Sequence, residues 1–115
     1  MDHQLEREVK ELHNTVCSAL ADPTRILMIY LLASGRRNVT DIAHELGLSQ
    51  PTTSRHLKNL RQRGLVNTER EGNNVYYSLA DPKLVQALDL LREVLVGIIK
   101  RRAAALDMLY PSEED

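Results

Sequence analysis

The stretch that decides the fold is VTDIAHELGLSQPTTSRHL, residues 39–57. Its apolar residues recur at helical spacing on both sides of Gly47, so it predicts two helices, one over 41–46 and one from Ser49 to about Arg63. Glycine readily adopts the positive φ that ends a helix in a tight turn. The stretch therefore predicts a helix-turn-helix.

Local signals support both helices of this motif. Thr40 and Ser49 stand where each helix begins, and their hydroxyl oxygens can accept a hydrogen bond from a free backbone N–H group. Ala43 is small enough for the second helix to cross the first closely, and Leu48 can fill the gap between them. Ser49 also leaves the amides and the positive dipole end of its helix free for a phosphate.

The second helix has a thin apolar seam, made by Leu57 and Leu60, and a broad polar and basic remainder. Such a helix must turn that remainder toward water or a ligand. In a DNA-binding helix these positions face base edges and phosphates of the major groove. The candidate DNA-binding residues on this helix are Ser49, Gln50, Thr52, Thr53, Ser54, Arg55, His56 and Lys58.

A β-hairpin is predicted directly after this helix. Runs rich in β-branched and aromatic residues at 65–68 and 75–79 flank Glu71-Gly72-Asn73-Asn74, where Gly and Asn tolerate positive φ. A hairpin at this place makes the motif a winged helix. Its side chains could reach a minor groove or its phosphates, and the candidates are Arg70, Asn73 and Asn74.

Two further helices are expected at the ends of the chain, at 1–20 and 81–107, and a core helix at 23–33 follows the Asp22-Pro23 cap. The terminal helices are more apolar than one small core can cover, and an exposed apolar surplus usually marks an interface. We therefore expect a dimer built from both. The candidate interface residues are Leu5, Val9, Leu12, Val16, Leu84, Leu88, Leu91, Leu95 and Ile98.

Composition restricts the alternatives. The 115 residues predict one domain, and the longest apolar run, of eight residues at 26–33, is far short of a membrane span of about 20. The charged first residues predict no signal peptide, and a single cysteine fits the reducing cytoplasm. The net charge of −1 hides a middle segment, 36–74, with seven Lys/Arg against four Asp/Glu, which suggests a polyanion site. No catalytic motif occurs, so we expect no enzyme and no cofactor.

Cys17 has three open interpretations. It can be a small core residue, because free cysteine is often buried. It can sense oxidants, which requires a lowered thiol pKa. It can bind a metal with His13, one helical turn earlier, and with His3 nearby in the sequence.

Residues from about 16 to 96 resemble the ArsR family of winged-helix transcriptional repressors, many of which sense metals. The resemblance rests on ALADPTR at 19–25, LSQPTTSRHL at 48–57, the segment from Leu60 to Val66, and VYYSL at 75–79. It implies a homodimer, formed by the first and last helices, that binds a palindromic operator and is released by an inducer.

The sequence departs from this family at its metal ligands. Members similar to arsenic and cadmium sensors have cysteines where this chain has Asn38 and Thr40. Zinc-type members have ligands where this chain has Lys83, Val94 and Gly97, and one remaining carboxylate does not make a site for zinc, which takes about four ligands. The resemblance therefore implies neither of the usual metal sites.

The sequence as a whole predicts a mostly α-helical winged helix-turn-helix protein, a single domain over 1–115, dimerised through 1–20 and 81–107. Its expected function is repression by sequence-specific binding to double-stranded DNA in the cytoplasm, with an unidentified inducer and no contact with a membrane. Two alternatives remain: a metal- or redox-responsive repressor that senses through Cys17 with His13, and a winged-helix module that binds proteins.

Overall fold

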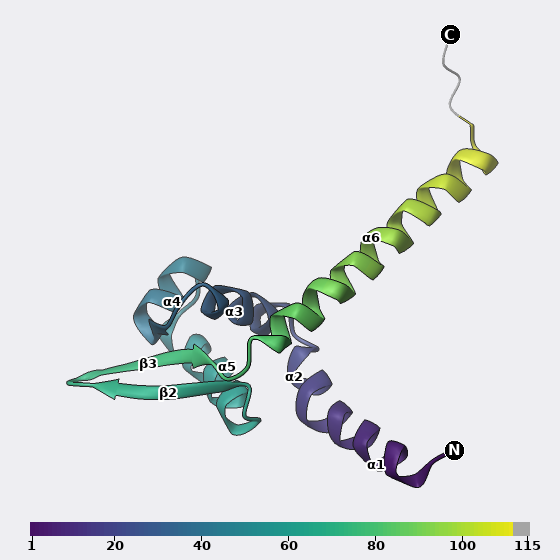
Figure 1. The fold of residues 1–115 in the computed structure, drawn as a ribbon. Helices are drawn as coiled ribbons and strands as arrows, with labels where there is room; N and C mark the ends of the chain where they lie inside the picture. Colours follow the sequence, from purple (N-terminus) through teal and green to yellow (C-terminus); the bar gives the residue numbers. More distant parts are fainter. Residues whose placement is uncertain (112–115) are drawn as a thin grey trace. The chain divides into compact units, whose positions relative to one another are not determined.

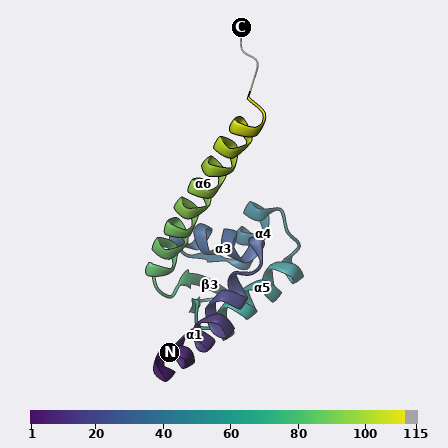
Figure 2. The same ribbon diagram turned by 90° about the vertical axis from the view of Figure 1, so that its right-hand side faces the viewer.

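The computed structural model describes residues 1–111 of the chain, and these belong to two compact units, Met1–Pro82 and the segment that starts at Lys83. The first unit contains five α-helical segments, one π-helical turn and a three-stranded sheet (Figures 1 and 2). The second unit contains a single long helix. The expected winged helix-turn-helix is confirmed in the first unit.

The sequence predicts one regular N-terminal helix, but the structure has three segments there. It consists of α1 (His3–Leu12), a π-helical turn η1 (His13–Cys17) and α2 (Ser18–Leu20). The hydrogen bond from Ser18 N to His13 O spans five residues, which defines the π turn. This wider turn leaves carbonyl oxygens free for side chains, and the Ser18 hydroxyl donates to Asn14 O at 2.6 Å.

The core helix α3 (Pro23–Ala33) has the predicted bounds. The Asp22 carboxylate accepts a hydrogen bond from Thr24 N at 2.8 Å, and Pro23 occupies the first turn, where no backbone donor is lost. Gly35 follows the helix with a φ of 145°. The predicted cap is therefore confirmed, and a glycine in a conformation that other residues rarely adopt follows the helix.

The motif helices are α4 (Val39–Leu46) and α5 (Gln50–Gln62). Helix α4 begins earlier than predicted, because Asn38 and not Thr40 is its cap: Asn38 Oδ1 accepts from Asp41 N at 2.8 Å. The cap of α5 is Ser49, as predicted.

The wing is the hairpin of β2 (Val66–Glu71) and β3 (Asn74–Leu79). Its strands are longer than predicted and pair from Val66 opposite Leu79 to Glu71 opposite Asn74, so the turn shrinks to two residues. Only Gly72 has a positive φ there, 59°, which is the pattern of a type II′ turn. A third strand, β1 (Arg37–Asn38), pairs with β3 and gives the sheet order β1-β3-β2.

The core of the first unit is aliphatic, as expected for a sequence without Trp or Phe. Helices α3 and α4 pack against β3, α5 packs against β2, and α3 also packs against α5. The fully buried residues with the largest side chains are Met28, Ile29, Ile42, Thr53, Leu57 and Leu60.

The second unit is α6 (Lys83–Leu109), which begins two residues later and ends two residues later than the predicted 81–107. Leu88 is its one buried residue within the described part of the chain. Among residues 1–111 no single helix is long and apolar enough to span a membrane. Only the pair His3–Leu20 and Pro23–Ala33, taken together, has the length and composition of a membrane span, and the chain bends by 87° between these two helices.

Candidate nucleic-acid interface

The turn between α4 and α5 fixes the start of the recognition helix. Gly47 has φ 66° and ψ 36°, and the next residue, Leu48, donates its N–H to Ala43 O at 2.9 Å. This is a Schellman arrangement, which satisfies carbonyls at the end of α4. Ser49 Oγ then accepts from Thr52 N at 3.2 Å and caps α5.

One side of α5 packs into the core and is excluded from any interface. Thr53, Leu57 and Leu60 are fully buried there. The Thr53 hydroxyl donates to Ser49 O at 2.8 Å and has no exposed surface. Thr53 was a candidate for base contact, and that expectation is wrong because no DNA can reach its side chain.

The opposite side of α5 is open. Ser49, Gln50, Ser54, Arg55 and Lys58 are exposed, and Thr52 and His56 are half-buried at its edge. Gln50 is held at this surface, because its Nε2 donates to Thr40 Oγ1 of α4 at 2.9 Å. A side chain fixed in this way is suited to reading a base edge, since little conformational freedom remains to be lost on binding.

The basic side chains of the middle segment divide into two groups. Arg36 and Arg37 form ion pairs with glutamates, and Arg63 donates to the carbonyls of Asn14 and Thr15 in η1. Within residues 1–111, four others form no such contact: Arg55, Lys58, Arg61 and Arg70. The positive surface is therefore smaller than the sequence suggested, and lies on α5 and the wing.

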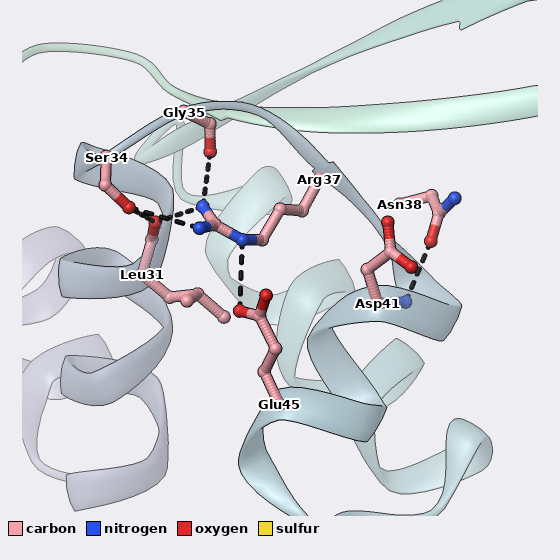
Figure 3. A network of polar contacts seen from close by, with 7 residues as sticks. All are labelled: Leu31, Ser34, Gly35, Arg37, Asn38, Asp41 and Glu45. Carbon is pink, nitrogen blue, oxygen red and sulfur yellow. Dashed lines mark hydrogen bonds and ion pairs between the residues drawn. The ribbon is translucent and has the colours of Figure 1, made fainter.

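Arg37 positions the helix-turn-helix against α3 (Figure 3). Its guanidinium donates to Leu31 O, in the last turn of α3, at 2.5 Å and to Gly35 O, in the loop that follows, at 2.8 Å. Its Nε lies 3.0 Å from the Glu45 carboxylate of α4. One side chain thus ties the end of α3 and the following loop to the first helix of the motif.

Arg36 neutralises one face of the wing. It lies 2.8 Å from Glu71 and 3.3 Å from Glu69, and its guanidinium stacks 4.3 Å above the Tyr76 ring. The hydrogen bond from Arg36 lowers the pKa of Glu71 and raises that of Arg36. Side chains alternate along a strand, so Arg70 points to the face opposite Glu69 and Glu71. Arg70, Asn73 and Asn74 are all exposed, as a wing contact with DNA requires.

A group of side chains beside the recognition helix could not be predicted from the sequence. Arg25 of α3, Asn59 and Gln62 join Arg55, His56 and Lys58 around a cavity of about 400 Å³. No motif marks these residues, because Arg25 lies 31 positions from His56 in the chain and reaches it only through the packing of α3 on α5.

Asp22 balances part of the charge near this cavity. Its carboxylate lies 3.8 Å from Arg25. Burial raises the pKa of Asp22, and the hydrogen bond from Thr24 N lowers it. The attraction of His56 and Arg25 lowers it further, so the net pKa lies below the ordinary value of 3.8.

Cys17 and His13 both lie in the π turn η1 and are exposed. Cys17 is therefore not a core residue, which was one of its three interpretations. His13 Nδ1 lies 3.2 Å from Asn14 Oδ1. Among residues 1–111 no group of three or more His, Cys, Asp or Glu side chains could hold a metal ion.

The candidate dimer residues differ in exposure. In α1 the side chains of Leu5, Val9 and Leu12 are about half exposed, and Val16 in η1 is half-buried. In α6, Leu91 and Leu95 are exposed, Leu84 and Ile98 are half-buried, and Leu88 is buried. Further apolar side chains continue along α6 to Leu106 and Leu109.

The fold and this surface together define a winged helix-turn-helix protein with a capped, basic recognition helix. A model of the family described as "Bacterial regulatory protein, arsR family" matches residues 22–68. NolR, a nodulation protein of Rhizobium meliloti, is 32% identical over 100 residues, covering 82% of each chain. The chain belongs to the ArsR family of bacterial regulatory proteins.

Two further proteins similar to this chain are a repressor and a DNA-binding domain. A biofilm growth-associated repressor of Xylella fastidiosa is 30% identical over 87 residues, which cover 76% of this chain and 75% of that protein. The homodimeric winged helix-turn-helix DNA-binding domain of Mycobacterium bovis has a TM-score of 0.71 and 30% identity, over 83% of this chain and 87% of that one.

Proposed function

We propose that the protein is a transcriptional repressor that binds double-stranded DNA as a homodimer, with α5 in the major groove and the wing beside it. The observation that carries this proposal is the exposed side of α5. There Gln50 is held in place by Thr40, and Arg55 and Lys58 form no ion pair within residues 1–111. Base edges need fixed hydrogen-bonding groups, and phosphates need free cations.

The proposed dimer uses the apolar side chains of α1 and α6. Leu5, Val9, Leu91 and Leu95 are exposed in the single chain, and a second copy would remove them from water. The homodimeric relative from Mycobacterium bovis supports this assembly. A symmetric dimer presents two recognition helices, so the operator we expect is a palindrome with half-sites about one helical turn apart. The proposed site of action is the cytoplasm, where a bacterial regulator meets chromosomal DNA.

The proposed inducer is not a metal ion at the positions used by metal-sensing relatives. Asn38 caps α4 with its amide oxygen, and Thr40 accepts a hydrogen bond from Gln50, so neither provides a thiolate for a soft metal. An apolar ligand of the terminal helices, or an oxidant at Cys17, remains the candidate signal. Operator affinity with and without zinc, cadmium and arsenite, in wild type and Cys17→Ser, tests this. Metal-driven release that survives Cys17→Ser would refute it.

Binding to DNA is tested by fluorescence anisotropy with duplexes from the protein's own promoter and with random-sequence duplexes. We expect tighter binding to the promoter, and Gln50→Ala should reduce that preference while changing random-sequence affinity little, because base contacts specify and phosphate contacts do not. Equal losses on both duplexes would exclude base readout by Gln50. No binding of the wild type to either duplex would favour the protein-binding module instead.

A further inference from the structure

We propose that the cavity between α3 and α5 binds a phosphate group of the DNA backbone, with Arg25 as its fixed cation. This proposal rests on the proposed DNA-binding function and adds a residue outside the helix-turn-helix to it. The cavity measures about 400 Å³ and no carboxylate lines it. Its lining residues are Arg25, Arg55, His56, Lys58, Asn59 and Gln62.

Arg25 is held in position before any ligand arrives. Its Nε donates to Ala19 O at 2.6 Å and its Nη2 to Ser18 O at 3.3 Å, which caps the C-terminal carbonyls of α2. Its side chain is only 16% exposed. The remaining nitrogen, Nη1, lies 3.5 Å from His56 Nδ1 and 3.8 Å from Asp22. A guanidinium fixed in this way can bind a phosphate with little loss of side-chain freedom.

The contact with Arg25 also selects one tautomer of the neutral His56 ring. A guanidinium has only donors, so a hydrogen bond between Nη1 and His56 requires Nδ1 to accept. The neutral ring then has its proton on Nε2, which makes Nε2 a donor to an anion. Both Arg25 and His56 therefore offer donors to a phosphate, and Asp22 is not among the residues that line the cavity.

Asn59 also lines this cavity. Its Oδ1 is buried and has no hydrogen-bond partner among the described residues, so a phosphate in the open cavity does not reach this atom. The side-chain amide nitrogen is a donor, and it is the atom of Asn59 that can bind a phosphate oxygen.

The position on α5 favours DNA as the source of the phosphate. Arg55, Lys58 and Gln62 are spaced at i, i+3 and i+7, so they share one side of the helix, away from the buried Leu57 and Leu60. When a recognition helix lies in a major groove, backbone phosphates border it. Arg25 would therefore bind a backbone phosphate of the DNA strand that passes on the α3 side of α5.

The test uses Gln62→Glu, because Gln62 is exposed and its replacement leaves the contacts of Arg25 with α2 intact, whereas Arg25→Gln would remove them. The matched control is Gln86→Glu, the same change on an exposed residue of α6. Affinity for a random-sequence duplex is measured across a salt series. We expect Gln62→Glu to weaken binding about tenfold and to reduce the log–log salt slope by about 0.9 per chain, with Gln86→Glu like wild type.

Unchanged affinity and slope in Gln62→Glu, with a wild type that binds DNA, would overturn the phosphate site and leave the proposed function standing. A wild type that binds no DNA would refute the proposed function itself.

The second arm titrates ¹⁵N-labelled protein with inorganic phosphate against chloride at equal ionic strength. We expect saturable NMR shifts at Arg25 Nε–H and at His56 in wild type, weakened in Gln62→Glu. No saturable shift would count against phosphate chemistry in the cavity. Saturable shifts combined with unchanged DNA binding by Gln62→Glu would assign the cavity to a free phosphorylated ligand and overturn its assignment to DNA.

Discussion

Arg37 shows how one side chain can determine the placement of a functional element. It connects Leu31 and Gly35 at the end of α3 with Glu45 in α4, through two carbonyl contacts and an ion pair. Replacing it by Ala would leave these carbonyls and the carboxylate without their donor, and hydrogen bonds to charged groups contribute more than neutral ones.

We expect Arg37→Ala to reduce the free energy of unfolding by about 2 kcal/mol. Urea denaturation at fixed protein concentration measures this. The control is Arg36→Ala, whose ion pairs lie in solvent and should contribute less than about 1 kcal/mol. An equal loss in both variants would show that Arg37 is not a special link between α3 and α4.

Asp22 predicts a pH dependence of stability. Its pKa in the folded chain is lowered, so it contributes stability above its unfolded pKa that is lost as the pH falls through the folded value. Asp22→Asn keeps an oxygen that can cap α3 but cannot titrate. The difference in melting temperature between wild type and Asp22→Asn should be largest near neutral pH and should shrink below about pH 4. A difference that is constant with pH would contradict this.

At the scale of elements, the wing divides its charges between two faces. On one face Arg36 forms ion pairs with Glu69 and Glu71, and on the other face Arg70 is the cation. Phosphate contacts made by a wing carry no sequence information, so their loss should weaken all DNA alike.

Arg70→Ala should therefore reduce affinity for promoter and random-sequence duplexes by the same factor and lower the salt slope by about 0.9 per chain. Anisotropy titrations with both duplexes measure this. Asn67→Ala, an exposed change at the base of the wing in β2, serves as the control. A loss confined to the promoter duplex would mean that Arg70 reads bases.

Elements with strong local signals could be predicted from the sequence, and those that depend on distant partners could not. Asp22-Pro23 and Ser49 mark the starts of α3 and α5 because caps act within a few residues. The two-residue strand β1 exists only through its pairing with distant residues of β3, Asn38 opposite Tyr76 and Arg37 opposite Tyr77. No local pattern specifies such a strand.

The π turn η1 did leave a trace in the sequence. Leu12, Val16 and Leu20 follow one another in two steps of four, which drift around a regular α-helix. A π turn holds an extra residue and absorbs this drift. In the interface, Thr53 was misplaced because its neighbours are polar, whereas its hydroxyl is satisfied inside the helix by Ser49 O. Arg25 was missed because its role depends on the packing of α3 against α5.

At the scale of the whole molecule, the proposed DNA binding depends on a second copy of the chain. Leu95 of α6 is 50% exposed in the single chain, so a charge there would remain hydrated and the chain should fold. In a dimer seam the same charge would be buried without a partner, which costs several kcal/mol. Leu95→Asp should therefore dissociate the dimer without unfolding the chain.

Sedimentation velocity and circular dichroism measure this prediction together. The control is Gln86→Asp, which the helical period places on the side of α6 opposite the stripe from Leu84 to Ile98. We expect Leu95→Asp to sediment as a monomer with wild-type helix content and Gln86→Asp to sediment as a dimer. A dimeric Leu95→Asp would exclude this face of α6 from the interface.

Sedimentation equilibrium of the complex with a palindromic duplex from the protein's own promoter tests dimeric DNA binding directly. We expect two chains per duplex, bound through α5 and competed poorly by random-sequence DNA. Leu95→Asp should bind the same duplex at least about tenfold more weakly, because two half-sites need two linked recognition helices. A single wild-type chain bound tightly to the palindrome, or no binding at all, would contradict the account.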